Sequence, residues 1–278
     1  MQSPSALGET ARQGGAFTAA AEPKTSGRRS LRRLMFASQK GGVGKTASAV
    51  NVALALGESS YKVLIVDTDP NGAVAACFGT TLPPGHPGVY GMSQWGIDDL
   101  VIPELAPNVD LLPYAEDRRA VDLNSLHTSM DILSEQAQSI YDFMIVDTRP
   151  SVADMTRRLC QVVDEVVVVF QCHPLAYRTL GGILGQLRDA RADGASARLL
   201  GLLLTMVDRR DPLAVQLEAH IRRSLGQALF PVSIPHDPLV AEGLMVDRPI
   251  VQYLPDSPVA RAYRELTHVL VNTVQPAG

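Results

Sequence analysis

The sequence predicts a single α/β domain with a mostly parallel sheet and helices on both faces. Apolar segments of strand length alternate with segments of helical spacing along most of the 278 residues. Repeated strand–helix units form parallel sheets, because each helix returns the chain to the edge where the next strand starts. Length alone permits one large domain or two small ones, but no internal repeat or linker divides the chain.

The first strand–helix unit surrounds a glycine-rich loop. We expect a buried strand at 34–38 before this loop and a helix at 46–56 after it. A second buried strand at 63–66 leads into the acidic sequence 67–70. The remaining expected strands cover 109–112, 143–146, 165–170, 199–204 and 230–234, and the remaining helices cover 97–100, 125–139, 152–161, 175–192, 212–225 and 258–274.

The N-terminal segment differs in composition from the rest of the chain. Residues 1–33 carry six basic residues against two glutamates and are rich in Ala, Ser and Gly. We expect a disordered basic leader at 1–33 and the folded domain at 34–278. The leader either stays solvated or attracts nucleic acid or acidic lipid weakly.

Bulk composition favours a globular protein in a reducing compartment. The chain is 46% hydrophobic, yet no apolar run reaches the length of about 18 to 20 residues that a membrane span requires. The N-terminus lacks the apolar core of a secretory signal, so we expect no export. Cys77, Cys160 and Cys172 are too scattered for a disulfide framework or a metal cluster. These features predict a cytoplasmic location.

A phosphate-binding loop is the strongest motif in the sequence. Residues 39–46 read Gln-Lys-Gly-Gly-Val-Gly-Lys-Thr, with glutamine where an ordinary phosphate loop has its first glycine. The glycines let backbone N–H groups point inward, and the following helix adds its positive dipole end. Lys45 should reach the β- and γ-phosphates, Thr46 should bind Mg²⁺, and Asp147 should hold a metal-bound water. The sequence therefore predicts a P-loop NTPase domain that uses ATP and Mg²⁺ and binds them through Lys40, Gly41, Gly42, Val43, Gly44, Lys45, Thr46 and Ala47.

Lys40 requires a separate role, because Lys45 already supplies a cation to the same phosphates. The chain contains only four lysines, and two of them stand in this loop. The position of Lys40 at the start of the loop suits a reach across to the nucleotide of another molecule. Such a cation would act like an arginine finger and make hydrolysis depend on dimerisation.

Asp67 and Asp69 follow the second expected strand and are two further candidates for catalytic or metal-binding residues. Either of them positions the attacking water near the γ-phosphate, and the other contacts the metal shell. The sequence Asp-Pro-Asn-Gly at 69–72 is also a good turn. Beside a phosphate loop, catalysis is the favoured interpretation.

Taken together, these residues resemble the ParA/MinD family of deviant Walker ATPases, and most of all the small ParA (Soj-like) partition ATPases. The likeness runs from about Leu34 to Val274. Its signature lysine is Lys40, its first switch is 67–72 and its second switch is 147–151. Further matching segments are 203–210, Ile234-Pro235, 240–242, 248–250, Tyr253, Ser257 and Tyr263.

The resemblance implies a nucleotide-driven dimer. In that family two subunits sandwich two ATP molecules, with each Lys40 touching the partner's nucleotide, and weak hydrolysis is stimulated by a ParB-like or cargo-adaptor protein. Asp69 would orient the water, and Asp147 would hold the metal shell. With Lys40 and Lys45, Asp69 would be catalytic, and the metal set would be Thr46, Asp69 and Asp147. The adenine pocket would be lined by the stretches 205–208 and 234–235, among them Thr205, Met206, Asp208 and Pro235.

Two positions depart from the family pattern. Ala47 stands where the family usually has a second threonine that touches the α-phosphate, which removes a contact worth about 1 kcal/mol. Arg149 stands where the second switch often has a proline.

The resemblance also implies a homodimer that binds DNA without sequence preference and is nucleoid-associated. Such binding requires several cations on one face. Basic candidates lie within 178–191 and at Arg209 and Arg210. MinD-like members use a basic amphipathic C-terminal helix for the bilayer, but no Lys or Arg follows Arg264, so we expect no membrane partner. The DNA-binding residues that we expect are Arg188, Arg191, Arg222 and Arg223.

Three functions compete. The leading one is a ParA-type ATPase that positions or segregates a plasmid, a chromosome origin or a protein assembly such as a carboxysome. A membrane or scaffold switch of MinD or flagellar-regulator type is the first alternative. A metabolic P-loop ligase that phosphorylates a small substrate is the second.

Overall fold

The computed structural model describes residues 29–115, 122–150 and 153–273. Within these residues, seven strands form one sheet in the order β3-β4-β2-β5-β1-β6-β7. Every neighbouring pair is parallel except β3 and β4, which run antiparallel at one edge. The strands are β1 (Arg32–Ala37), β2 (Val63–Asp67), β3 (Ile102–Ala106), β4 (Val109–Leu112), β5 (Phe143–Asp147), β6 (Glu165–Gln171) and β7 (Arg198–Thr205).

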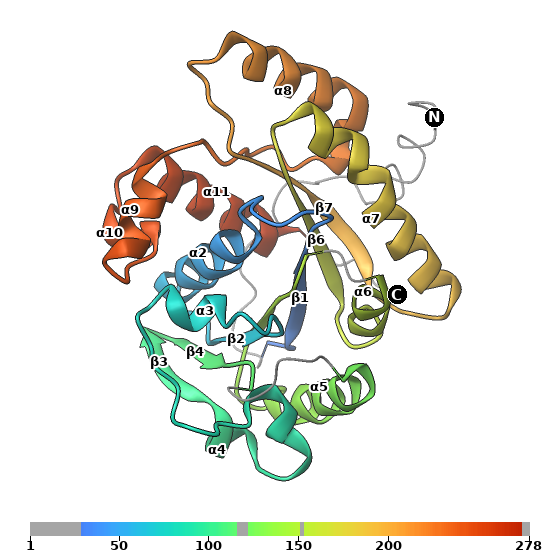
Figure 1. Ribbon diagram of the computed structural model, residues 1–278, viewed down its shortest axis with the longest axis vertical. Coiled ribbons are helices and arrows are strands. Elements are labelled where there is room, and N and C mark those ends of the chain that lie inside the picture. Colours follow the sequence, from blue (N-terminus) through green and yellow to red (C-terminus); the bar gives the residue numbers. More distant parts are fainter. Residues whose placement is uncertain (1–28, 116–121, 151–152, 274–278) are drawn as a thin grey trace.

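Helices cover both faces of this sheet, which confirms the predicted α/β class (Figure 1). One core packs α5, α6 and α7 against the sheet, and the other packs α2 and α11. The longer helices are α2 (Lys45–Glu58), α5 (Leu123–Ala137), α6 (Ala153–Leu159), α7 (Pro174–Ala192), α8 (Pro212–Leu225) and α11 (Pro258–Asn272), and the short ones are α3 (Ala73–Ala76), η1 (Gly88–Ser93), α4 (Ile97–Leu100), η2 (Gly226–Ala228), α9 (Leu239–Met245) and α10 (Ile250–Tyr253).

The central strand β1 shows why the strands read as continuous apolar runs. Met35 and Ala37 belong to one core, whereas Leu34 and Phe36 belong to the other. All four are almost completely buried. A strand with helices on both faces needs apolar side chains at successive positions, so period-two alternation is lost.

Side-chain caps fix where α8 and α11 begin. The carboxylate of Asp211 accepts a hydrogen bond from the N–H of Leu213, and the hydroxyl of Ser257 accepts one from the N–H of Ala260. Proline follows directly in both helices, where its missing N–H costs nothing. The predicted starts of these two helices are therefore confirmed.

The predicted strand at 230–234 is wrong. The chain there makes only isolated bridges, Leu202 with Leu229 and Val207 with Pro235. The N–H groups of Phe230 and Ile234 donate to the carbonyls of Leu202 and Leu204, but no continuous ladder forms between these contacts, so the segment runs beside β7 without forming a strand.

The antiparallel strand β3 was not predicted. It carries Pro103 and a residue with positive φ, Glu104 (φ 54°), and its pairing with β4 is irregular. Such a sequence is tolerated only at a sheet edge. Pro103, which cannot donate to a ladder, is why the sequence does not predict a strand here.

The N-terminal boundary also differs from expectation. Residues 1–28 of the predicted leader lie outside the described residues. Arg32 and Arg33, which we assigned to the leader, are the first residues of β1. Arg32 pairs with the buried Glu165 at 2.7 Å, and Arg33 pairs with Asp164. No helix among the described residues is long and apolar enough to cross a membrane.

Candidate nucleotide-binding site

The glycine-rich loop connects β1 to α2 at the carboxyl edge of the sheet, as predicted. Gly42 and Gly44 have φ values of 74° and 82°, which L-amino acids with side chains rarely adopt. Gly44 is also the residue that precedes the first turn of α2. These two glycines turn the chain so that the helix N-terminus faces the site, which favours an anion there.

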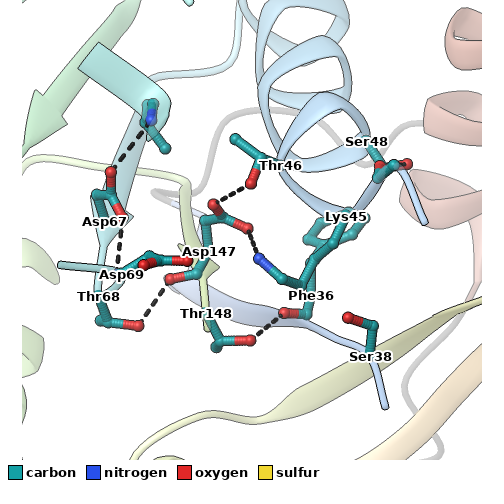
Figure 2. A network of polar contacts seen from close by, with 12 residues as sticks. Phe36, Ser38, Lys45, Thr46, Ser48, Asp67, Thr68, Asp69, Asp147 and Thr148 are labelled. Carbon is teal, nitrogen blue, oxygen red and sulfur yellow. Dashed lines mark hydrogen bonds and ion pairs between the residues drawn. The ribbon is translucent and has the colours of Figure 1, made fainter. Parts of the chain in front are cut away.

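Lys45, Thr46 and Asp147 form one buried contact set (Figure 2). The Nζ of Lys45 donates to one carboxylate oxygen of Asp147 at 2.6 Å, and the hydroxyl of Thr46 donates to the other at 2.7 Å. Asp147 is fully buried and Lys45 is 6% exposed. Burial raises the pKa of Asp147, and the neighbouring Lys45 opposes that rise. The sequence predicted these three residues, and the fold brings them together.

Asp67 and Asp69 face different surroundings. The carboxylate of Asp67 accepts hydrogen bonds from the N–H groups of Asp69 at 2.9 Å and Val74 at 3.1 Å, so it shapes the turn (Figure 2). Burial, followed by the nearby Asp147, raises the pKa of Asp67 to about 7. Asp69 lines the cavity, and one of its oxygens accepts from the N–H of Asn71. Asp69 is therefore the carboxylate that can meet a ligand.

A cavity of about 610 Å³ opens beside the loop. This volume is within the range of small-molecule and cofactor sites. Pro150, which belongs to the expected second switch, lies next to the loop. A Cβ atom added to Gly41 would be 3.5 Å from the side chain of Pro150. The predicted site residues that line the cavity are Lys40, Gly41, Gly42, Gly44, Lys45, Thr46, Ala47, Asp69, Thr205, Met206 and Pro235.

Three predicted residues do not line this cavity. Val43 is buried in the core, and its carbonyl accepts a hydrogen bond from the hydroxyl of Thr205 at 2.7 Å. Asp208 instead pairs with Arg210 at 2.9 Å, and this contact lowers the pKa of Asp208 to about 2. Asp147 lies behind Lys45 and Thr46, and its carboxylate accepts hydrogen bonds from both.

Part of the cavity wall comes from residues to which the sequence assigns no place in the site. Val240, Ala241 and Leu244 of α9 line it, as does the buried Tyr263 of α11. The helix α9 spans seven residues, which is too short for helical periodicity to be recognised. The proline at position 238 was the available signal, because it precedes the first turn of α9.

The expected DNA-binding arginines occupy unequal positions. Arg188, Arg191 and Arg223 are exposed on α7 and α8. Arg222 is different, because its guanidinium donates to Glu218, to Ser233 and to the carbonyl of Phe230. These contacts give Arg222 a structural role in joining α8 to the segment after it.

The residues present fit a nucleoside triphosphate with Mg²⁺. Positive-φ glycines and a helix N-terminus form an anion cradle, and Lys45 adds a buried cation. The described residues contain no group of three or more His, Cys, Asp or Glu that could hold a metal ion alone. A hydroxyl and a carboxylate suit a Mg²⁺ ion whose other ligands are phosphate oxygens and water.

Comparisons with known proteins found a matching family model, sequence relatives and solved structures of similar fold. The family model described as an AAA domain matches residues 31–196. The chain is 35% identical to the chromosome-partitioning ATPase Soj of Thermus thermophilus over 255 residues, 90% of this chain and 99% of that protein. It is 27% identical to the chromosome partitioning protein ParA of Caulobacter vibrioides across 87% of this chain and 94% of that protein. The septum site-determining protein MinD of Pyrococcus horikoshii, complexed with Mg-ADP, has a similar fold, with a TM-score of 0.69 at 23% identity covering 86% of this chain and 96% of that one.

Proposed function

Because this chain belongs to the ParA/MinD family of deviant Walker ATPases, we propose that it is an ATP-driven switch that binds DNA and positions or segregates a cargo. The contact set of Lys45, Thr46 and Asp147 beside a cavity of about 610 Å³ is the observation that carries the proposal. It unites a phosphate-binding cation, a hydroxyl for the metal and an acid that can hold a metal-bound water.

ATP and Mg²⁺ are the cofactors of the proposed reaction. Mg²⁺ supplies charge neutralisation on the phosphate oxygens when bound. Lys45 binds the β- and γ-phosphates, and Thr46 offers its hydroxyl to the metal. Asp69, whose carboxylate lines the cavity, orients the water that attacks the γ-phosphorus. Hydrolysis then proceeds mainly by positioning and electrostatic stabilisation.

Lys40 connects hydrolysis to dimerisation in this proposal. It is exposed and lines the cavity, whereas Lys45 is buried. An exposed cation at the cavity can reach the nucleotide of a second copy that closes against this face. The ATP-bound state is then a homodimer, and hydrolysis by each subunit depends on the lysine of its partner.

The dimer would bind DNA through arginines on α7 and α8. Arg188, Arg191 and Arg223 are exposed there and can displace counterions from phosphates. Arg222 would contribute by holding α8 in place, because its guanidinium is already bonded within the protein. The proposed location is the cytoplasm, on the nucleoid, and the cargo is a plasmid, a chromosome origin or a protein assembly such as a carboxysome. A ParB-like or cargo-adaptor protein would stimulate an otherwise weak ATPase.

DNA retention tests the proposal. The full chain is passed over immobilised random-sequence duplex DNA with Mg-ATP, with Mg-ADP or without nucleotide, at low and at raised salt. Retention should require ATP and disappear at raised salt, since counterion release drives binding. Lys45→Ala, which lacks the phosphate-binding cation, is the matched control and should not be retained under any condition.

Two other outcomes would contradict this function. ATP-dependent sedimentation with lipid vesicles, without retention on DNA, would identify a membrane or scaffold switch. Turnover stimulated by a small substrate but insensitive to DNA would instead identify a metabolic ligase.

A further inference from the structure

Threonine hydroxyls cross-link neighbouring strands at the carboxyl edge of the sheet. The hydroxyl of Thr68, directly after β2, donates to the carbonyl of Asp147 at 2.7 Å. The hydroxyl of Thr148, directly after β5, donates to the carbonyl of Phe36 in β1 at 2.9 Å. Figure 2 shows both bonds next to the carboxylates of the candidate site.

These bonds lie where the regular sheet ends. Asp147 pairs in register with Asp67 on one side and with Phe36 on the other. Beyond these positions the backbone leaves the sheet for the two switch segments. The N–H and the hydroxyl of Thr68 both donate to the carbonyl of Asp147, which uses both lone pairs of that oxygen. The hydroxyls therefore extend the cross-strand connection past the last backbone pair.

Burial makes these hydroxyls hard to explain by folding alone. Thr68 is fully buried and Thr148 is 4% exposed. Valine has the same shape and would bring no polar group that must be desolvated. The hydroxyl of Thr68 fixes the main chain immediately before Asp69 by bonding to the carbonyl of Asp147. The hydroxyl of Thr148 fixes the main chain immediately after Asp147 by bonding to the carbonyl of Phe36.

We infer that Thr68 and Thr148 are positioning residues for ATP hydrolysis, because their hydroxyls hold the backbone that carries Asp69 and Asp147. The inference rests on the proposed function. Neither threonine lines the cavity, so we expect neither to touch the nucleotide. Their effect passes through the two aspartates, whose placement against the γ-phosphate sets the rate.

A third threonine provides an internal contrast. The hydroxyl of Thr205 in β7 donates to the carbonyls of Phe170, in the neighbouring strand, and of Val43, in the phosphate loop. It holds the loop rather than a switch aspartate. Loss of this hydroxyl should therefore weaken ATP binding, whereas loss of the other two should slow hydrolysis without weakening binding.

Valine substitutions separate the two effects. The full chain and its Thr68→Val and Thr148→Val variants are assayed for phosphate release from Mg-ATP and for affinity for a fluorescent ATP analogue. We expect kcat to fall about tenfold with a Kd within about twofold of wild type, since misplacement of catalytic groups lowers the rate rather than the affinity. Thr68→Ser and Thr148→Ser, which keep the hydroxyl, should restore kcat.

Thr267→Val is the matched control. Thr267 is 3% exposed, and its hydroxyl donates to the carbonyl of Tyr263 at 2.9 Å within α11. Its loss removes a comparable buried hydrogen bond with no connection to a switch segment, so kcat should match that of wild type. Thermal melting shows whether each variant folds, and each of the two switch threonines tests the inference separately if the other variant does not fold.

The outcomes distinguish the inference from the function on which it rests. A folded valine variant with wild-type kcat overturns the inference alone, as does a variant that loses affinity and kcat together. Wild-type protein that releases no phosphate from ATP overturns the proposed function, and the inference with it.

Discussion

Lys40 and Lys45 stand five positions apart in one loop, yet their surroundings differ completely. Lys45 is buried against Asp147, whereas Lys40 is exposed. In the proposed reaction, Lys45 binds the nucleotide of its own subunit, and Lys40 reaches that of a second molecule. The rarity of lysine in the chain was the sequence signal for both sites.

We predict that Lys40→Ala spares ATP binding and abolishes stimulated hydrolysis. The lysine would act on the partner's nucleotide in the transition state, so its loss lowers the rate without loosening the resting complex. Phosphate release with and without the stimulating protein checks this, and Lys62→Ala removes an exposed lysine elsewhere as a control. Unchanged stimulated turnover would contradict the role given to Lys40.

Ala47 lines the cavity, at the position where the family resemblance implies a threonine. Ala47→Thr should restore a hydroxyl contact to the α-phosphate worth about 1 kcal/mol. The Kd for ATP should then fall about fivefold. Isothermal titration measures it, and Ala47→Val adds similar bulk without the hydroxyl. An equal gain in affinity from valine would show that packing, not hydrogen bonding, is responsible.

Asp67 should make the stability of the nucleotide-free protein depend on pH. Its pKa is raised from 3.8 to about 7, so the native state keeps a proton that the unfolded chain releases. The stability that this carboxyl contributes is therefore full below pH about 4 and is lost as pH rises through about 7. Thermal melting without Mg²⁺ at pH 5 and pH 8 checks this. Asp67→Asn, which cannot titrate, should lose less stability between the two values, and an equal loss would refute the assignment.

Individual site residues could be predicted from the sequence where the backbone geometry dictates the residue type. Glycines 42 and 44 and the pair of Lys45 and Thr46 follow directly from the needs of a phosphate cradle. Asp208 and Arg222 could not be placed, because each is engaged by a partner that is not fixed by local spacing: Arg210 for the first, Glu218 and Ser233 for the second. Such contacts depend on how side chains pack in the folded molecule.

At the scale of elements, the long helices and buried strands were predictable because their apolar patterns extend over many residues. Helix α9 and strand β3 were not, since one is short and the other carries Pro103 at the sheet edge. The segment after η2 looked like a strand because it is apolar. Instead it makes only isolated bridges to β7, and the ring of Phe230 packs against Gly201 of that strand.

Two glycine substitutions should change stability in opposite directions. A side chain on Gly201 would begin 2.8 Å from the ring of Phe230, so Gly201→Ala should cost about 1 to 3 kcal/mol. Gly185 lies within α7 and its nearest atom would be on Arg188 at 3.8 Å, so Gly185→Ala should stabilise the helix by up to about 1 kcal/mol. Melting temperatures measure both, and a destabilised Gly185→Ala together with a neutral Gly201→Ala would contradict this account of the packing.

At the scale of the whole molecule, Asp69 controls how long the proposed dimer lasts. Asp69→Ala should trap an ATP-bound dimer on DNA, because the water-orienting carboxylate is removed and ATP persists. Light scattering with Mg-ATP should give twice the monomer mass, and dissociation from DNA should be slower than for wild type. The same variant with Mg-ADP is the control. A monomer mass with ATP, or rapid release from DNA, would count against the scheme.

The strand order has a consequence for how the protein is made. The central strand β1 lies between β5 and β6, whose partners in register with Leu34 are Ile145 and Glu165. A ribosome therefore exposes the phosphate loop long before it exposes either flanking strand. The cavity itself is complete only after α9 and Tyr263 of α11 have been made, near the end of synthesis. Until β5 and β6 emerge, β1 has no neighbouring strand to pair with, and its apolar side chains stay unpaired in the nascent chain.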